Sequence, residues 1–302
     1  MRILFCSDPM NRREVDADYR EEYECARNAG FKVDLINLEE LIEGNPVRAI
    51  RSIPAADNVE RAIYRGWMMK PMHYELLYEC LKRNNIMLIT DNLAYRNCHH
   101  LPESYPVIKE YTPGTVWLHE EDLNDSIKLE QALQCFGQSP IMIKDFVKSQ
   151  KHHWHEACFV PDASDLNHVQ RVLEKFLELQ GTGLNEGIVF RAYVKLAHLT
   201  DHSISGMPLS KEYRVFYFEG QPIFLVNYWD EGKYDETAPQ LSAFNQVAEQ
   251  VNSPFFTMDL AQTDSGDWII VELGDAQVSG LPDHADIENF YTLLKRFFSA
   301  HS

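Results

Sequence analysis

Residues 255–283, FFTMDLAQTDSGDWIIVELGDAQVSGLPD, contain two apolar segments separated by the polar turn sequence TDSGD. This pattern predicts two adjacent β-strands joined by a turn. Asp259 lies within the first strand, and Glu272 lies near the end of the second. Neighbouring strands can place two side chains at one spot, and Asp275 follows where the second strand leaves the sheet. We therefore expect all three carboxylates to lie close together.

Three neighbouring carboxylates repel one another unless a cation lies between them. Carboxylate oxygens suit Mg²⁺, which proteins often hold jointly with nucleotide phosphates. The sequence therefore predicts a Mg²⁺ site formed by Asp259, Glu272 and Asp275. The alternative is that Asp259 and Glu272 are exposed residues on one face of a strand. Glu272 weighs against it, because this residue directly follows the apolar run WIIV, where an unpaired charge is costly to bury.

A second apolar strand carries a lysine. Residues 141–160 read IMIKDFVKSQKHHWHEACFV, and Lys144 lies inside the apolar run. A buried ammonium needs an anionic partner, which a nucleotide phosphate would supply. Alternatively, the stem of the side chain is buried and its amine reaches water. The loop that follows contains Lys148 and Lys151, and we expect it to fold over a triphosphate.

The same loop contains three histidines, His152, His153 and His155, and we expect it to end in a return strand at 156–160. The histidine spacing leaves a transition-metal site open, although solvated histidines are common. A contact with substrate or phosphate fits the neighbouring lysines better than a metal does.

An arginine follows on a later strand. In residues 211–224, KEYRVFYFEGQPIF, Arg214 alternates with apolar residues. It either faces the site, where it would neutralise charge on a transferring phosphoryl group, or faces solvent. Glu212 either accepts hydrogen bonds in the site or lies at the surface. The dipeptide Glu219-Gly220 predicts the turn of a hairpin.

Residues 186–196, EGIVFRAYVKL, predict a strand over 187–196 along the seam between two subdomains. The backbone groups of Ala192, Tyr193 and Val194 are candidates to bind the edge of an adenine. The basic side chains of Arg191 and Lys195 would contact ribose, phosphate or a substrate carboxylate. Cross-strand ion pairs are the alternative for both.

Strands and helices alternate in the first part of the chain. Apolar runs predict strands at 2–6, 31–38, 61–64 and 86–90, with helices at 15–28 and 72–83 between them. Such alternation predicts a parallel sheet covered on both faces. We expect an N-terminal α/β lobe at 1–95, followed by two α+β subdomains at 96–185 and 186–302 that close over a ligand.

The composition excludes several classes of protein. The chain has 302 residues, a net charge of −18 and 45% hydrophobic residues. This charge argues against nucleic acid as a partner, because phosphate contacts supply most non-specific binding. No apolar run is long enough to cross a bilayer, and the first residues do not resemble a signal peptide, so we expect no membrane partner and a cytoplasmic location. The six cysteines form no CxxC pair, which indicates buried free thiols rather than disulfides or a zinc site.

The order of these segments resembles the ATP-grasp superfamily. There, a strand lysine is followed by a linker strand that binds adenine, an arginine before the metal site, and an acidic residue followed by Glu-x-Asn. The resemblance extends from residue 95 to residue 281. The sequences KDFVKSQKHHWHEACFVPD (144–162) and VELGDAQVSGLPD (271–283) are similar to those of a little-characterised ATP-grasp clade, whose members carry domain-of-unknown-function names. The resemblance implies a two-subdomain ATP-grasp fold behind the N-terminal lobe.

The resemblance also implies roles for residues and two cofactors, ATP and Mg²⁺. Lys144 would bind the ATP phosphates, Arg214 would contact the reacting phosphoryl group, and the three carboxylates would hold Mg²⁺. Three departures from the family pattern stand out. Asp275 is the nearest counterpart of the family's Asn, residues 148–155 replace the glycine-rich lid loop, and the usual entry-segment lysine has only Arg96 and Lys109 as candidates.

The implied reaction joins a carboxylate to an amine through an acyl phosphate. Two alternatives use the same residues: an ATP-dependent kinase, and a non-catalytic protein that binds a nucleotide or peptide. The expected substrates are an amino acid, a peptide or a protein tail, and a homodimer is a family-level expectation. Four residues after an apolar strand, Arg65, Trp67, Lys70 and His73, either hold an anionic substrate or are ordinary surface residues.

Overall fold

The computed structural model describes residues 1–204, 207–234 and 238–300, apart from the side chain of Lys151. The chain forms two compact units, and each of them is assembled from separate parts of the sequence. Unit 1 comprises residues 1–98, 212–259 and 274–302, and unit 2 comprises residues 99–211 and 260–273. The three-domain division expected from the sequence divides the chain differently and stays a prediction.

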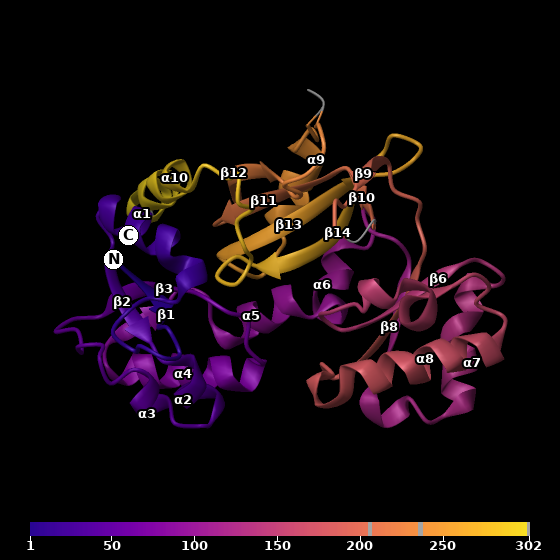
Figure 1. The fold of residues 1–302 in the computed structure, drawn as a ribbon, viewed down its shortest axis with the longest axis horizontal. Coiled ribbons are helices and arrows are strands. Elements are labelled where there is room, and N and C mark those ends of the chain that lie inside the picture. The colour runs from indigo at the N-terminus through magenta and orange to yellow at the C-terminus, as the bar shows by residue number, and fades with distance from the viewer. Residues whose placement is uncertain (205–206, 235–237, 301–302) are drawn as a thin grey trace. The chain divides into compact units, whose positions relative to one another are not determined.

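A four-stranded parallel sheet, ordered β2-β1-β3-β4, forms the first part of unit 1 (Figure 1). Its strands are β1 (Arg2–Cys6), β2 (Lys32–Ile36), β3 (Glu60–Arg65) and β4 (Ile86–Leu88). Every residue of β1 is buried, as is typical of a parallel strand covered on both faces. Ile3 and Phe5 pack into one core cluster, and Leu4 and Cys6 pack into another. The predicted parallel sheet is therefore confirmed.

Helices from both ends of the chain cover this sheet. They are α1 (Arg20–Asn28), α2 (Leu38–Ile42), α3 (Pro46–Ala49), α4 (Pro71–Arg83), α5 (Asn92–His99) and α10 (Ile287–Ala300). Another helix of unit 1, α9 (Ser242–Ala248), packs instead against the second sheet, which is described next. The last helix, α10, lies beside α1 (Figure 1), and Lys295 Nζ donates to the carbonyl of Gly30 at 2.7 Å. The apolar face of α10, which includes Phe290 and Leu294, buries itself in the same cluster as Ile3. The C-terminal helix therefore completes the core of the first lobe.

A second sheet has the order β12-β11-β13-β14. Its strands are β11 (Glu212–Phe218), β12 (Gln221–Asn227), β13 (Phe255–Gln262) and β14 (Trp268–Asp275). Between β11 and β12, Glu219 and Gly220 both have positive φ, 47° and 72°, as a two-residue hairpin turn of the mirror-image type requires. The predicted hairpin is confirmed. β13 and β14 are neighbours, as the sequence predicts, and each contributes residues to both units.

Unit 2 is built on an antiparallel sheet, ordered β5-β8-β6-β7. Its strands are β5 (Thr115–His119), β6 (Ile141–Asp145), β7 (Phe159–Val160) and β8 (Gly187–Ala192), and β9 (His198–Asp201) pairs separately with β10 (Pro208–Ser210). The helices are α6 (Leu101–Ile108), α7 (Ser126–Leu133) and α8 (Leu166–Gln180). One sheet face, including Ile143 and Phe190, packs with Val172 and Phe176 of α8. Asp165 caps α8, because its carboxylate accepts from the His168 N–H.

Several predicted boundaries are wrong. The helix expected at 15–28 begins at Arg20, after a 3₁₀ turn. The return strand expected at 156–160 is reduced to β7, because residues 154–158 form a π-helical turn that buries Ala157 and Cys158. The strand expected at 187–196 ends at Ala192. Four helices (α2, α3, α5 and α6) and the β9–β10 pair were not predicted. The short 3₁₀ segments are Ala17–Tyr19, Glu120–Asp122, Gln134–Phe136, Lys151–His153 and Gly181–Gly183.

All six cysteines are free. Four of them are buried, in agreement with the sequence, but Cys25 is half-buried and Cys135 is exposed. Cys135 is exposed because it lies in the short 3₁₀ segment that ends at Phe136, outside the core. In the described part of the chain, no helix combines the length and the hydropathy needed to span a bilayer.

Gly187, the first residue of β8, allows a very close approach of two strands. A Cβ atom built there would lie 2.2 Å from the carbonyl oxygen of Leu118 and 2.8 Å from the ring of Phe146. We expect Gly187→Ala to lower the free energy of unfolding by about 1–3 kcal/mol, because one of these contacts must shift.

Thermal or urea unfolding measures this change. Gly114→Ala in the same unit is the matched control, because a Cβ at Gly114 meets nothing within 4 Å. Equal stability of the Gly187→Ala and Gly114→Ala proteins would contradict the close approach.

Candidate functional site

One face of the unit 2 sheet carries the basic residues that the sequence singled out. Lys144 of β6 is opposite Val189 of β8, and Met142 is opposite Arg191. Side chains directly across an antiparallel pair share a face, so Lys144 and Arg191 lie on the same side of the sheet. The other side is the apolar core with α8. The sheet therefore presents two buried cations on the face that α8 does not cover.

Lys144 has a carboxylate partner in this structure. Its Nζ donates to Glu272 Oε2 at 3.0 Å. The Lys144 side chain is only 6% exposed, whereas the Glu272 side chain is 38% exposed. The alternative in which the lysine amine reaches water is therefore wrong, because the amine is buried and bonded to a carboxylate that itself faces outward.

Arg191 is buried and held by uncharged acceptors. Its Nη2 donates to the hydroxyl of Thr112 and to the carbonyl of Ile270, the latter at 3.2 Å. Its Nε has no hydrogen-bond partner among the described residues. Burial lowers the pKa of Arg191 to about 10, and the Glu272 carboxylate opposes that shift. The guanidinium stays charged at neutral pH and still has one buried donor to offer to an anion.

His99, the last residue of α5, is also influenced by the Glu272 carboxylate. Burial and then the neighbouring His100 lower the pKa of His99 to about 3, while Glu272 opposes them. His99 is therefore neutral at pH 7. No local sequence pattern pointed to this residue, because its burial arises only in the folded chain.

Asp145 fixes the base of the basic loop. It is fully buried, and its Oδ1 accepts from the N–H groups of Val147 and Lys148. Its Oδ2 accepts from Gln180 at 2.9 Å and from the side chain of Asn185 at 2.8 Å. The aspartate thus ties the start of the loop to the end of α8. The sequence analysis did not single out Asp145, although an aspartate at a strand end followed by a turn is a usable signal.

The loop itself is partly as expected. Lys148 is exposed, and the side chain of Lys151 lies outside the described residues. His153 Nδ1 lies 3.7 Å from Glu156 Oε2. Within the described residues, no three His, Cys, Asp or Glu side chains gather as metal ligands, so this structure gives no support to a histidine metal site.

An aromatic group connects the loop to the seam strand. The ring of Trp154 stacks on Phe159, with centroids 5.5 Å apart, and Phe159 meets the ring of Tyr193 edge-on at 5.1 Å. The N–H of Tyr193 donates to Pro140, and that of Ala192 donates to Gly114. Both N–H groups are therefore used within unit 2. An adenine edge would have to bind backbone carbonyls or the N–H of Val194.

Lys195, at the end of the seam segment, forms an ion pair. Its Nζ lies 2.9 Å from Asp264 Oδ2, and both side chains are exposed. This geometry matches the ion-pair alternative for Lys195, whereas Arg191 is held by the hydroxyl and carbonyl acceptors described above. An exposed pair of this kind is easily exchanged for another partner, because it contributes little to stability.

Unit 1 contains a second cation–carboxylate pair. Arg214 of β11 binds Asp259 of β13 through two parallel hydrogen bonds, Nε–Oδ1 and Nη2–Oδ2, both 2.8 Å. Its Nη1 also donates to the carbonyl of Gly280 at 3.0 Å, and the guanidinium lies 4.7 Å from the ring centre of Tyr228. Arg214 is therefore largely buried, and the solvent-facing alternative is wrong. Glu212, at the start of β11, is also buried.

Asp275, at the end of β14, is a buried carboxylate with one unused oxygen. Its Oδ1 accepts from the backbone N–H and the side-chain amide of Gln277, at 3.0 and 3.1 Å. Its Oδ2 has no hydrogen-bond partner among the described residues. Burial raises the pKa of Asp275 to about 7, and the Gln277 hydrogen bonds and Arg65 oppose that rise. A cation beside Oδ2 would satisfy this oxygen, so the residue fits a Mg²⁺ ligand.

Gln277 and Arg65 position the segment that follows Asp275. Gln277 accepts from the Tyr64 N–H at 2.9 Å and donates to the Tyr74 hydroxyl at 2.8 Å. Arg65 pairs with Glu22 at 2.6 Å and donates to the carbonyl of Ala276 at 3.0 Å. These contacts fix the backbone next to Asp275 to the parallel sheet.

The group of Arg65, Trp67, Lys70 and His73 is thus not a single anion site. Arg65 is 2% exposed and has its own carboxylate, so it serves the fold. Trp67 is partly exposed and donates its indole N–H to Asp16 at 2.9 Å. Lys70 precedes α4 and His73 lies in its first turn.

The three predicted metal ligands are divided between the units. Asp259 and Asp275 belong to unit 1, and Glu272 belongs to unit 2. Two of the three are bonded to a predicted phosphate-binding cation, and the third has an unused oxygen. The described residues include no group of three His, Cys, Asp or Glu side chains that could hold a metal ion, so the Mg²⁺ site made by all three stays a prediction.

Comparison with known proteins places these residues in a family context. A family model described as "ATP-grasp domain, R2K clade family 3" matches residues 135–294, slightly more than half of the chain. A search of curated protein sequences found no significant match.

Solved structures of similar fold span nearly the whole chain. They include a RimK domain protein ATP-grasp from Sphaerobacter thermophilus, with a TM-score of 0.60, 12% identity, and 98% of this chain and 99% of that chain covered. The ATP-grasp ligase PsnB, complexed with a minimal precursor variant, Mg and ADP, has a TM-score of 0.58, 11% identity and 98% coverage of both chains. D-alanine–D-alanine ligase from Bacillus anthracis, complexed with ATP, has a TM-score of 0.55, 16% identity, and 99% and 95% coverage. At these identities the likeness shows the fold alone.

The raised pKa of Asp275 predicts a pH-dependent stability. A carboxyl group with a folded pKa near 7 and an unfolded pKa of about 3.9 stabilises the fold fully only below about pH 4, and this contribution is lost as the pH rises through 7. We therefore expect Asp275→Asn to raise the free energy of unfolding at pH 8, by up to about 4 kcal/mol without metal, and to raise it by less at pH 5.

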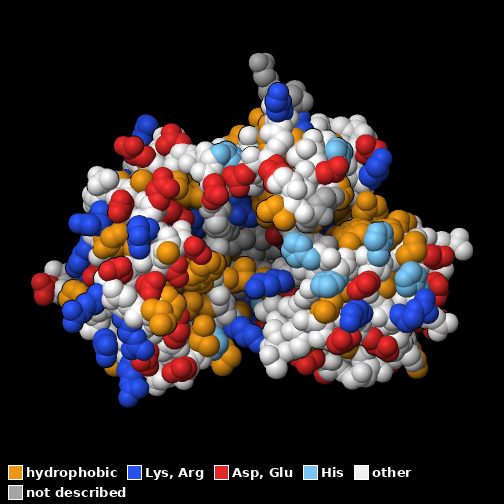
Figure 2. All heavy atoms as spheres, viewed as in Figure 1, with side chains coloured by type: hydrophobic (Ala, Val, Ile, Leu, Met, Phe, Trp, Pro, Cys, Tyr) orange, Lys and Arg blue, Asp and Glu red, His pale blue; other side chains and the backbone are white. Residues whose placement is uncertain are grey.

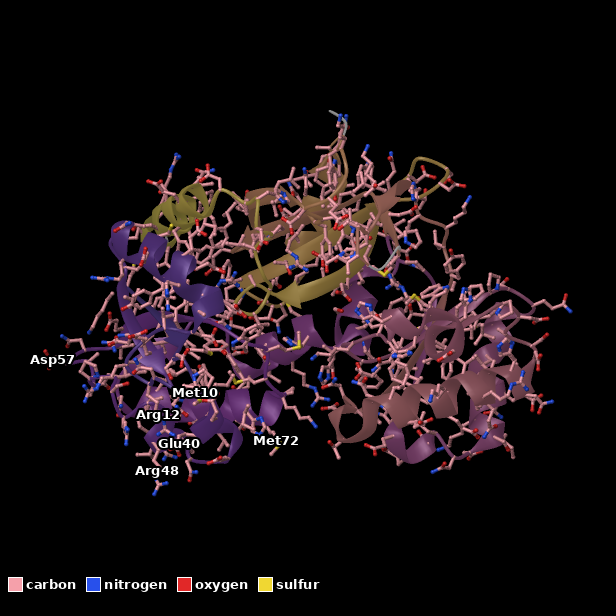
Figure 3. The ribbon with its side chains drawn as sticks, viewed as in Figure 1. Met10, Arg12, Glu40, Arg48, Asp57 and Met72 are labelled. Carbon is pink, nitrogen blue, oxygen red and sulfur yellow. The ribbon has the colours of Figure 1, made fainter. Side chains whose placement is uncertain are left out.

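Thermal unfolding at pH 5 and pH 8, without metal or nucleotide, measures this difference. Asp57→Asn is the control, because Asp57 is exposed and points away from the molecule in Figure 3. If Asp275→Asn gains no more stability at pH 8 than at pH 5, the buried Asp275 carboxyl does not carry an unfavourable charge at pH 8, which contradicts its raised pKa.

Proposed function

Because the chain belongs to the ATP-grasp family of the R2K clade, we propose that it is an ATP- and Mg²⁺-dependent ligase that joins a carboxylate to an amine. One observation carries the proposal. Each cation predicted to bind phosphate, Lys144 and Arg214, is bonded to a carboxylate predicted to bind Mg²⁺. When Mg²⁺ and a triphosphate bind, Mg²⁺ can pair with the two carboxylates and the triphosphate can pair with Lys144 and Arg214. Both ion pairs can therefore be exchanged at once. These four side chains are then paired both in the free protein and in the protein with bound Mg²⁺ and triphosphate, which avoids the large cost of a lone buried ion.

The residues divide into four roles under this proposal. Lys144 and Arg214 bind the reacting phosphates, and Asp259, Glu272 and Asp275 hold Mg²⁺. Phosphate contacts come from Lys148, Lys151 and Arg191. We assign the adenosine end to the segment Ala192, Tyr193, Val194 and Lys195, and a further nucleotide contact to Glu212.

The proposed reaction has two steps. A carboxylate oxygen of the substrate attacks the γ-phosphorus of ATP, the bond to the β-phosphate oxygen breaks, and ADP leaves. The amine nitrogen then attacks the acyl carbon, phosphate leaves, and the nitrogen loses a proton to give the amide. Lys144 and Arg214 stabilise negative charge on the transferring phosphoryl group, and Mg²⁺ would neutralise the phosphate oxygens. Catalysis of this kind depends on position and charge, so no side-chain nucleophile is needed.

Amino acids and peptides are the proposed substrates. One similar structure is a ligase of D-alanine, and another holds a precursor peptide. Both belong to ligases, and this favours ligation over phosphorylation as the outcome in this chain. A nucleic acid is not expected as substrate, given the net charge of −18.

The first test is whether Mg²⁺ and a non-hydrolysable ATP analogue stabilise the protein through Lys144. At about 100 times its dissociation constant, the ligand should add roughly 2.7 kcal/mol, which raises Tm by several degrees at this size. The shift should require Mg²⁺ and should be lost in Lys144→Ala.

Lys175→Ala is the matched control, because Lys175 is an exposed lysine of α8 that pairs with Glu178 one turn away. It should keep the full shift. The absence of any shift in the wild type at millimolar nucleotide would refute the proposed ATP site.

A second test separates ligase from kinase. ADP and inorganic phosphate should be released in equal amounts from ATP when carboxylate and amine pairs are supplied, and phosphate release should depend on the amine. ADP release with a stable phosphorylated product and no amine requirement would identify a kinase instead.

A further inference from the structure

Unit 1 contains a pocket at the carboxyl ends of β1 and β2 that no step of the proposed reaction uses. Its volume is about 520 Å³, which is in the range of small-molecule sites. It is lined by Ser7, Met10, Asn11, Arg12 and Arg13 from the loop after β1, by Leu35 and Asn37 at the end of β2, and by Arg48, Ala49, Arg51 and Ser52 from α3 and beyond. In open parallel sheets, ligands bind at this edge, outside the carboxyl ends of the strands.

The lining is strongly basic. Four arginines, Arg12, Arg13, Arg48 and Arg51, line the pocket, and no Asp or Glu does so. One carboxylate, Glu40, lies next to it, 3.0 Å from Arg12 and 4.0 Å from Arg48 (Figure 3). Figure 2 shows Lys and Arg side chains gathered in this region of unit 1, at the lower left of the view. Such a concentration of positive charge is notable in a chain with a net charge of −18.

Two polar side chains of the pocket are buried without a partner. Ser7 is 3% exposed and Asn37 is 7% exposed. Neither the Ser7 hydroxyl nor the Asn37 side-chain nitrogen has a hydrogen-bond partner among the described residues. Asn37 Oδ1 is already used, because it accepts from the Glu40 N–H at 2.8 Å. An unsatisfied buried donor is unfavourable, so these two donors point to an acceptor that fills the pocket.

The loop that carries two of the arginines is pre-ordered. Asp8 Oδ1 accepts from the N–H groups of Met10 and Asn11, at 2.7 and 2.8 Å. Backbone bonds from Asp8 to Glu14 and from Ser7 to Ile36 close the loop onto β2. A ligand therefore meets a wall that is already in place, and binding orders little additional chain.

We propose that this pocket binds a small anion that carries at least two negative charges, on carboxylate or phosphate groups. The planar guanidinium groups can each give two parallel hydrogen bonds to such a group, and Ser7 and Asn37 donate from the floor. The site is separate from the proposed ATP site and does not depend on the ligase function.

The proposal is tested by isothermal titration at low ionic strength, without Mg²⁺, with two probes. Inorganic pyrophosphate represents a phosphate ligand, and glutarate represents a dicarboxylate. At least one probe should bind the wild type with a Kd of about 1 mM or lower, and binding should weaken as salt is added. The same Kd should be found in Lys144→Ala, which excludes binding at the proposed ATP site.

The pocket variant is Arg13→Glu with Arg51→Glu, because both side chains are exposed and their loss leaves the Glu40 pairs intact. It should weaken binding by about tenfold or more. The control with the same net charge is Arg20→Glu with Arg171→Glu, on the exposed faces of α1 and α8, and it should bind like the wild type. Preference for one probe identifies the ligand chemistry as carboxylate or phosphate.

Ser7→Ala distinguishes a ligand site from a structural one. The hydroxyl has no partner among the described residues, so its removal should leave Tm unchanged or higher while the Kd rises several-fold. The proposal is overturned if neither probe binds the wild type, if the Arg13/Arg51 variant binds as tightly as the Arg20/Arg171 control, or if Ser7→Ala loses stability and keeps its affinity.

Discussion

Most of the site depends on the pairing of buried cations with carboxylates. Arg191 and Asp275 are exceptions, because each keeps one buried polar atom without a hydrogen-bond partner among the described residues. Lys144 is bonded to Glu272, Arg214 to Asp259 and Arg65 to Glu22. Removing one member of such a pair costs far more than the pair contributes, because the remaining ion is left without solvent. Two of the three pairs join residues with expected roles toward phosphate and metal. The third pair, Arg65–Glu22, holds the backbone beside Asp275. Paired buried charges therefore occur both among the candidate site residues and among the residues that position them.

Besides forming a core, the parallel sheet of unit 1 positions the segment that follows β14. Tyr64 and Arg65 lie at the end of β3, and both bind the segment that follows β14. Gln277 links that segment to Asp275 and also to Tyr74 of α4. The position of a candidate metal ligand is thus set by residues about 200 positions earlier in the chain. Side chains of this kind tune a site without touching its ligand, as outer partners of metal ligands commonly do.

The strands could be predicted from the sequence, but the side-chain contacts between distant segments could not. The apolar run around Lys144 and the hairpin at Glu219-Gly220 are local patterns, and both formed as expected. The partner of Lys144 could not be predicted, because Glu272 is distant in sequence and nothing local specifies the pairing. The seam strand ended early because backbone bonds at Ala192 and Tyr193 lead to loops rather than to a ladder. The pocket lined by four arginines was missed for a similar reason. Two of its arginines follow β1 and the other two lie in or just after α3, and only the fold brings them together.

The interleaving of the two units has a consequence for how the chain is made. Unit 2 requires residues 99–211 and also 260–273, and the core of unit 1 requires α10, which follows residue 286. A ribosome delivers the N-terminal lobe first, yet the helix that covers one face of its sheet emerges only after all the segments of unit 2. Unit 2 therefore cannot complete its fold before residue 273 has been made, and unit 1 cannot complete its core before α10 has been made. During translation the apolar face beneath α10 stays uncovered, so the nascent chain depends on slow elongation or on a chaperone more than a protein of consecutive domains would.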